Sequence, residues 1–250
     1  MGSLSGLKNV QIIILGLCIA GATIFSTFVL SKGVIQFKRL TEEVITVTGS
    51  AEKDIVSDYI VWKSGFTRRN PKLKEAYTQL QGDLAKVKKY LLSKGVKEDE
   101  IIVSQVETST LYKKNEKGND TNEIEGYLVS QVVEVRSYDV EKVTDISRQS
   151  TELLDQDVQF ISGAPEYFYT KLPELKIEML AKATENAKAR AEKMAASTGN
   201  KIGAIRSAKM GKFQINAANS YDVSWYGNYD TSSYDKKVIA IAHASFAIEE

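Results

Sequence analysis

The sequence predicts an α+β protein in which helices pack on sheet, preceded by one N-terminal transmembrane helix. Three observations lead to this fold class. An uncharged apolar stretch occupies residues 9–31. After residue 43, segments with the alternating hydrophobicity of strands are interrupted by segments with the 3.6-residue period of helices, in the order β-β-α-β-β-α-β-α-β-β. A content of 43% hydrophobic and 26% charged residues is typical of a folded chain.

The stretch 9–31 is long enough to cross a membrane. As a helix it would span about 35 Å, against about 30 Å of hydrocarbon. We expect an uncleaved anchor, with residues 32–43 as a polar linker. The alternative is a cleaved signal ending at Ala20-Gly21-Ala22, although the apolar run continues to Leu30. A lipid-modified Cys18 is disfavoured because a leucine precedes it. A short arm before the anchor and a large domain after it favour an extracytoplasmic domain, either periplasmic or at the cell surface.

Residues 44–51 and 55–69 alternate as strands. Asn70 and Pro71 match an N-cap followed by proline at the first helical position, and the helix that they predict runs to Lys94 before Gly95. Residues 101–114 and 124–137 then predict a β-hairpin whose polar tip is 115–122.

Asp139 caps a predicted helix that runs to Leu154, and residues 158–169 are extended. Pro173 opens a third helix, which ends at Gly199. Its inner stripe is small and suits close packing: Met179, Ala183, Ala187, Ala191 and Met194. Strands at 201–215 and 237–248 complete one compact domain over 44–250, with two lobes as an alternative arrangement. The last strand has two apolar faces, which predicts a central, covered strand.

The composition excludes several functional classes. A formal net charge of +1 disfavours a nucleic-acid partner. One cysteine and one histidine exclude an intrachain disulfide and any multi-histidine or multi-cysteine metal site, so we expect no metal and no cofactor. The sequence has no P-loop, G-x-G-x-x-G, H-E-x-x-H or G-x-S-x-G motif. His243 has apolar neighbours at 241 and 247, which predicts a structural role. A hydrolase would instead need a pocket that holds two carboxyl groups with perturbed pKa values.

The loop 219–235 is the candidate interface or binding surface. It carries five aromatic residues in a polar stretch: Tyr221, Trp225, Tyr226, Tyr229 and Tyr234. Such residues are enriched in interfaces and also stack on sugars, although the loop can equally cover its own core. Two helices also differ in charge. Residues 71–94 carry six basic and two acidic residues, a net charge of +4. Residues 139–157 carry two basic and six acidic residues, a net charge of −4. These helices could steer head-to-tail subunit pairing or be two solvated faces.

Four segments resemble the SIMPL-domain family in the family's order, and the last of them is the final strand, Ile239–Ile248. Val44–Ala51 resembles its opening strand, and Gly126–Val135 resembles its G-Y-x-x-S-Q-x-V-x-V strand. The end of the alanine-rich helix, Ala196–Gly203, resembles its helix-to-strand turn. The resemblance covers about residues 41–250 and departs from the family at Gly163-Ala164-Pro165. It implies an envelope location, homo-oligomers that are ring-like in some members, and an association with oxidative-stress defence, but it brings no catalytic residues.

We therefore expect a non-enzymatic, membrane-anchored envelope protein that self-assembles into a homo-oligomer with a structural or stress-defence role. The alternative is a ligand- or glycan-binding module that uses the aromatic loop. The sequence identifies no small-molecule substrate.

Overall fold

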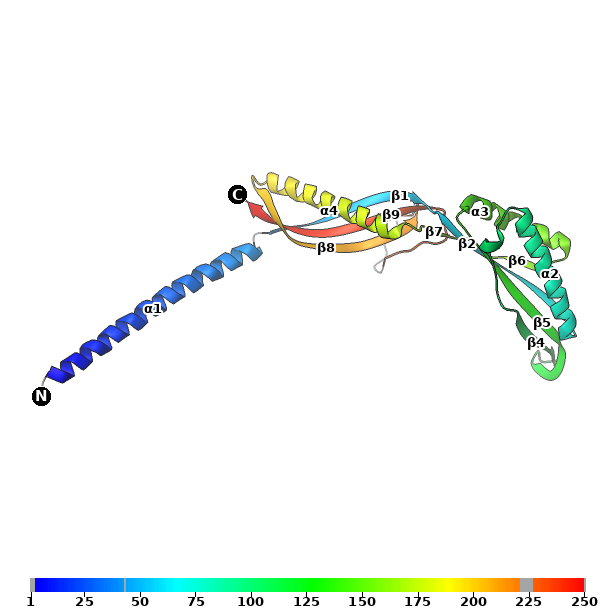
Figure 1. The fold of residues 1–250 in the computed structure, drawn as a ribbon, viewed down its shortest axis with the longest axis horizontal. Coiled ribbons are helices and arrows are strands. Elements are labelled where there is room, and N and C mark those ends of the chain that lie inside the picture. Colours follow the sequence, from blue (N-terminus) through cyan, green and yellow to red (C-terminus); the bar gives the residue numbers. More distant parts are fainter. Residues whose placement is uncertain (1–2, 43, 221–226, 250) are drawn as a thin grey trace. The chain divides into compact units, whose positions relative to one another are not determined.

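The computed structural model describes residues 3–42, 44–220 and 227–249, and its fold is α+β, as predicted (Figure 1). The chain divides into two compact units. The first comprises Met1–Ser50, Leu180–Gly211 and Ile241–Glu250, and the second comprises Ala51–Met179 and Lys212–Ala240.

The N-terminal segment forms one helix, α1, over Ser3–Glu42. The helix does not end at Ser31 but continues through the residues that we expected to form a linker. Residues Ile13–Gln36 form an apolar span of 24 residues with a mean hydropathy of 2.3, and none of the span is buried. Length and composition of this kind suit a membrane anchor and a signal sequence alike.

A three-stranded sheet has the order β1-β9-β8, from strands at Val44–Val56, Asp235–Glu249 and Lys201–Ala217. The prediction that the last strand is central is therefore confirmed, whereas the expected cover of both its faces is not, because His243 is exposed. Helix α4, at Leu172–Ala196, buries Ala187 and Ala191 in a small cluster with Val47, Ala244 and Phe246. The predicted small stripe is correct except at its end. Met194 is 54% exposed and Ala195 is buried instead, because Ala195 continues the four-residue step from Ala187 and Ala191.

Helix α4 lies against β1 in the first unit with almost no space between them. A Cβ atom on Gly49 would lie 2.1 Å from the carbonyl oxygen of Ala183. Two α4 side chains also form hydrogen bonds with the β1 backbone. The Ser50 amide donates to Asn186 Oδ1, and Arg190 Nη1 donates to the Thr48 carbonyl, each at 3.2 Å. Because these polar groups are satisfied, β1 does not present this stretch as an open sheet edge.

The second unit holds an antiparallel sheet of order β3-β5-β2-β6, with β4 added beside β5 and β7 beside β2. Its strands are β2 (Tyr59–Asn70), β3 (Ile101–Val103), β4 (Glu107–Lys114), β5 (Asp120–Ser137), β6 (Phe160–Ser162) and β7 (Glu166–Phe168). The helices are α2 (Leu73–Ser93), η1 (Glu98–Glu100), α3 (Val140–Gln149) and η2 (Ser150–Gln156). Helices and sheet share one core, which includes Trp62, Phe66, Leu80, Val133 and Leu153.

The predicted strand order needs correction at two places. Segment 101–114 forms two strands, because the Ser104 hydroxyl accepts a hydrogen bond from the Val132 amide and takes the place of a ladder contact. Segment 158–169 also forms two strands, β6 and β7. They are separated by a turn that contains Pro165, which has no N–H to donate.

The helix boundaries follow the predicted capping residues in most cases. Asp139 caps α3 through the Lys142 amide, and Gly95 and Gly199 have φ values of +87° and +83° just beyond α2 and α4. Helix α2 starts at Leu73, two residues later than predicted. The reason is that Asn70 Oδ1 accepts the Lys72 amide and closes a turn before the helix begins.

The helices of opposite charge contact each other within the chain. Lys94 of the basic helix lies 3.0 Å from Glu152, and Lys86 Nζ donates to the Gln156 carbonyl at 2.7 Å. Asp83 on α2 is also buried, and Arg68 of β2 holds its carboxylate with two hydrogen bonds of 2.5 and 2.9 Å. Some of the charge that we considered for subunit pairing therefore stabilises the second unit.

Candidate functional site

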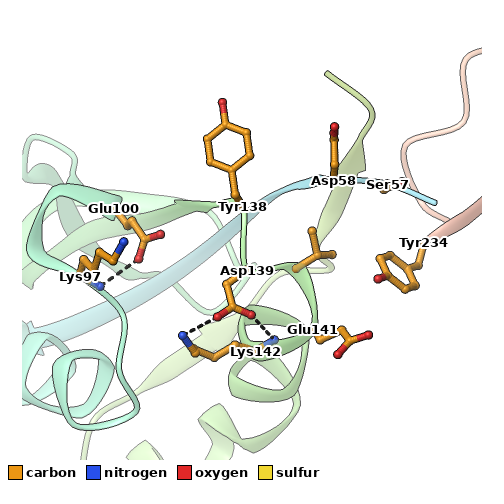
Figure 2. Close-up of a pocket in the computed structure, with 10 residues that line it drawn as sticks. Ser57, Asp58, Lys97, Glu100, Tyr138, Asp139, Glu141, Lys142 and Tyr234 are labelled. Carbon is orange, nitrogen blue, oxygen red and sulfur yellow. Dashed lines mark hydrogen bonds and ion pairs between the residues drawn. The ribbon is translucent and has the colours of Figure 1, made fainter. Parts of the chain in front are cut away.

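A polar cavity of about 610 Å³ lies in the second unit where three chain turns meet (Figure 2). The turn between β1 and β2 contributes Ser57 and Asp58, η1 contributes Glu100, and the junction of β5 and α3 contributes Tyr138 and Asp139. Lys97, Val140, Glu141, Lys142 and Tyr234 complete the lining.

Three carboxylates of this cavity are engaged in holding its turns together. Asp58 accepts the amide and hydroxyl of Thr170 at 2.7 and 2.9 Å. Glu100 accepts the Ser137 hydroxyl at 2.6 Å. The hydrogen bond from Lys142 lowers the pKa of Asp139, so this carboxyl stays ionised at neutral pH. An ionised, paired carboxylate suits a structural role, whereas a general acid needs a raised pKa.

The cavity also presents hydroxyl groups and aromatic rings, together with the charged side chains of Lys97 and Glu141. The Ser57 hydroxyl is buried and has no hydrogen-bond partner among the described residues. Tyr138 extends from the junction into solvent (Figure 2). Its ring meets the Tyr59 ring edge-on, at 5.0 Å between centroids. Groups of this kind can bind and orient a polar ligand.

A second hollow of about 420 Å³ lies on the face of the sheet that carries the odd-numbered residues of β2. Along β2, Ile60 and Trp62 are fully buried, while Tyr59, Val61 and Lys63 line this hollow. Lys63 lies 3.8 Å from Glu134 and 3.9 Å from Glu166 on the neighbouring strands. The other lining residues are Arg136, Phe168, Tyr169, Thr170 and Tyr229. Four aromatic rings and a row of charges thus share one open groove.

The candidate aromatic residues do not form one surface in the part of the chain that the structure describes. Tyr229 is about half exposed and lines the groove of the second hollow. Tyr234 instead lines the first cavity and packs on the core, with its ring 5.9 Å from that of Tyr167. Tyr221, Trp225 and Tyr226 lie outside the described residues.

A buried ion pair that the sequence analysis missed fixes the second half of this loop. The Lys236 side chain is 2% exposed, and its Nζ donates to the Asp230 carbonyl at 2.5 Å and lies 3.6 Å from Oδ2. Burial by itself would raise the pKa of the Asp230 carboxyl. Hydrogen bonds from Ser232 and Ser233, together with the charge of Lys236, outweigh burial and hold that pKa at about 2. The alternation of β9 could have indicated this burial. Lys236 lies two residues before Val238, so the two side chains share the buried face of the strand.

His243 lies on the exposed face of the three-stranded sheet. Its Nδ1 shares a hydrogen bond of 2.9 Å with the Thr48 hydroxyl, and this is its one hydrogen bond within residues 44–220 and 227–249. The next pair along the same strands, Thr46 and Ser245, repeats the contact at 2.9 Å. Two successive cross-strand pairs of this kind link β1 and β9. In those same ranges, no group of three or more His, Cys, Asp or Glu side chains is arranged to hold a metal ion.

Together, the fold and these cavities define an α+β protein with an apolar N-terminal helix. The family model described as SIMPL, protein of unknown function (DUF541), matches residues 45–241. The match spans most of the chain, so the protein belongs to the SIMPL family. No curated protein matches the sequence. Among solved structures, a de novo designed protein, Foldit4, is similar with 20% identity, a TM-score of 0.20, and coverage of 42% of this chain and 93% of that chain.

Proposed function

We propose that this protein is a membrane-anchored, non-enzymatic structural protein of the cell envelope that self-associates outside the cytoplasm. The observation that carries the proposal is the apolar span of α1. Its 24 residues correspond to about 36 Å of helix, enough for the hydrocarbon core of a bilayer. Large apolar side chains such as Leu17, Ile24 and Phe25 are exposed all around it. A helix that is apolar on every side needs lipid or protein around it.

Two further features support the structural role. Anchoring confines copies of the protein to one plane and raises their effective concentration, so that weak contacts between them suffice for assembly. Asp58 and Glu100 of the cavity in Figure 2 close turns, and His243 bonds a threonine on an open sheet face. These groups are engaged within the chain, which fits a structural role, and we propose that a part in stress defence follows from assembly.

Labelling of cysteines tests the anchor and its orientation. The chain has one cysteine, Cys18, inside the span, so a Cys18→Ser background is free of native thiols. We expect Asn119→Cys, in the exposed hairpin turn, to react with a membrane-impermeant maleimide on intact cells. Ser3→Cys should react only after lysis. An intact mass that begins after Ala22 would overturn the anchor, and an Asn119→Cys that stays unlabelled until lysis would overturn the orientation.

A second candidate function is glycan binding in the groove that contains Tyr59, Phe168 and Tyr229. The favouring observation is that these rings lie beside Glu134 and Glu166, whose oxygens can accept hydrogen bonds from sugar hydroxyls. Tyr229→Ala should then abolish the retention of oligosaccharides without changing the mass of the assembly. A change in mass together with unaltered sugar binding would assign the groove to protein contacts.

A further inference from the structure

Strand β8 has a stretch that is exposed on both of its faces. The strand lies at the margin of the sheet whose order is β1-β9-β8 (Figure 1). Every residue of 204–210 is exposed, whereas a strand covered on one face would bury every second residue. Helix α4 packs instead on β1 and β9, through the small cluster that contains Ala187 and Ala191. Within the described chain, this stretch of β8 is therefore open to solvent.

The face of the sheet that carries His243 continues onto β8. A Cβ atom on Gly211 would lie 3.0 Å from the Cβ atom of Ile241, so these two positions project to the same face. By the two-residue period of a strand, Lys209 shares this face with His243. His243 in turn bonds the Thr48 hydroxyl on β1. Hydroxyl, imidazole and ammonium groups thus lie together on an open face, and such groups bind phosphate oxygens.

Basic side chains outnumber acidic ones on this surface. Glu249 lies over Gly203, and the first half of β8 carries three exposed basic residues: Lys201, Arg206 and Lys209. None of the three side chains forms an ion pair or hydrogen bond within residues 3–42, 44–220 and 227–249. Between them, Ile205 and Met210 are 50% and 57% exposed. Basic residues interspersed with exposed apolar ones are typical of segments that lie in a membrane interface.

The two units of the chain differ in charge. The parts of the first unit that follow the apolar span, 37–50, 180–211 and 241–250, carry nine basic and six acidic residues, a net charge of +3. The second unit carries 22 basic and 26 acidic residues, a net charge of −4. A bilayer with anionic lipids attracts the first of these charges and repels the second. The unit that is joined to the anchor is therefore the one that such a bilayer attracts.

The connection to α1 keeps this sheet close to the membrane. Six residues of α1 follow the apolar span, which ends at Gln36. They add about 9 Å of helix, slightly more than the depth of one headgroup layer. Strand β1 then begins at Val44, and the Thr46 hydroxyl already bonds the Ser245 hydroxyl of β9. The sheet is thus within reach of the lipid headgroups when α1 spans the bilayer.

We propose that β8 and the open sheet face beside it bind the anionic headgroups of the membrane that holds α1. Lys201, Arg206 and Lys209 pair with lipid phosphates, and Ile205 enters the boundary of the headgroup layer. This inference rests on the proposed membrane anchor and adds a second membrane contact that depends on charge.

A fluorescent probe on β8 tests this contact in the full-length protein. Ser207→Cys in the Cys18→Ser background would be labelled with an NBD maleimide, because Ser207 is exposed and lies two residues from Lys209 on the same face. The protein is placed in nanodiscs of phosphatidylcholine, alone or mixed with phosphatidylglycerol in equal parts, with a headgroup spin-labelled lipid as quencher. We expect quenching in the anionic discs at low ionic strength. High salt should abolish it, because screening shortens the range of the attraction.

Replacing the three basic residues by neutral ones should abolish the contact. Lys201→Gln/Arg206→Gln/Lys209→Gln should lower the ratio of quenched to unquenched probe in anionic discs about 100-fold. Each charge that is removed weakens attraction to an anionic surface about fivefold. Circular dichroism melts of the variant should match those of the parent protein, which separates loss of binding from loss of fold.

A matched control removes the same charge from exposed positions of the second unit. It is the triple variant Lys74→Gln/Lys114→Gln/Lys117→Gln, and quenching of the probe on β8 should be unchanged in it. A probe at Asn119→Cys, in the hairpin turn of the second unit, should stay unquenched in both kinds of disc.

The outcomes separate this inference from the proposed anchor. Salt-sensitive quenching in anionic discs that the neutral β8 variant loses would support it. Equal signals in the two kinds of disc, or quenching that persists in the neutral variant, would overturn headgroup binding by β8 and leave the anchor standing. A response to soluble polyphosphate without one to anionic discs would also overturn it and assign the face to a soluble polyanion. Protein that elutes apart from the discs would overturn the anchor and this inference together.

Discussion

Removing one partner of the ion pair between Arg68 and Asp83 should destabilise the second unit strongly, although only one charged group is lost. Asp83 is 2% exposed, and Arg68 holds both of its oxygens. Arg68 is also hydrogen-bonded to the carbonyl and carboxylate of Asp157, at the end of η2. Removing one partner of a buried pair leaves the other charge unpaired. We therefore expect Asp83→Leu to lower the free energy of unfolding by about 3–5 kcal/mol.

The assay is urea unfolding of the full-length protein, followed by tryptophan fluorescence. The chain has two tryptophans, and a Trp225→Phe background leaves Trp62, which is fully buried in the same core as α2. The double variant Arg68→Met/Asp83→Leu should be more stable than the sum of the single losses predicts, by at least about 2 kcal/mol. Glu75→Gln, which breaks the exposed pair between Lys72 and Glu75, is the control and should change nothing measurable. Additive losses, or less than about 1 kcal/mol for Asp83→Leu, would refute the argument.

Two glycines and one aspartate give three further predictions. Gly49→Ala should destabilise the protein by about 2 kcal/mol or more in thermal melts, because its Cβ meets α4 backbone atoms at 2.1 and 2.3 Å. The same change at Gly82, where nothing lies within 4 Å, should stabilise α2 by about 0.5–1 kcal/mol; a loss there would contradict the packing argument. Asp230 has a folded pKa of about 2 against 3.8 as its ordinary value. Its contribution of about 2 kcal/mol is complete above pH 4 and disappears as the pH falls through 2, and Asp230→Asn should flatten the corresponding part of the stability–pH curve.

Local sequence features determined most of the secondary structure. The spacing of the hydrophobic residues predicted where the strands and helices lie. Asp139, Gly95 and Gly199 marked helix ends, because capping depends on a few adjacent residues. One error arose where a distant residue intervened. Ser104 interrupts its strand by bonding to Val132, which lies on another strand. The candidate aromatic loop was located from composition, but composition could not assign Tyr229 and Tyr234 to different cavities.

The sequence by itself also determined the apolar N-terminal span and the membership of the SIMPL family, since both depend on the identity of residues along the chain. Only the tertiary structure revealed that Asp83 and Lys236 are buried, because a charge can be buried only where a partner from another element reaches it. Tertiary structure also decided which strand edges stay open. Helix α4 satisfies the backbone of β1 through Asn186 and Arg190, while β4 keeps one edge free in the described chain. Strand propensity is the same for a covered and an uncovered edge, so the neighbours that pack on each strand make the difference.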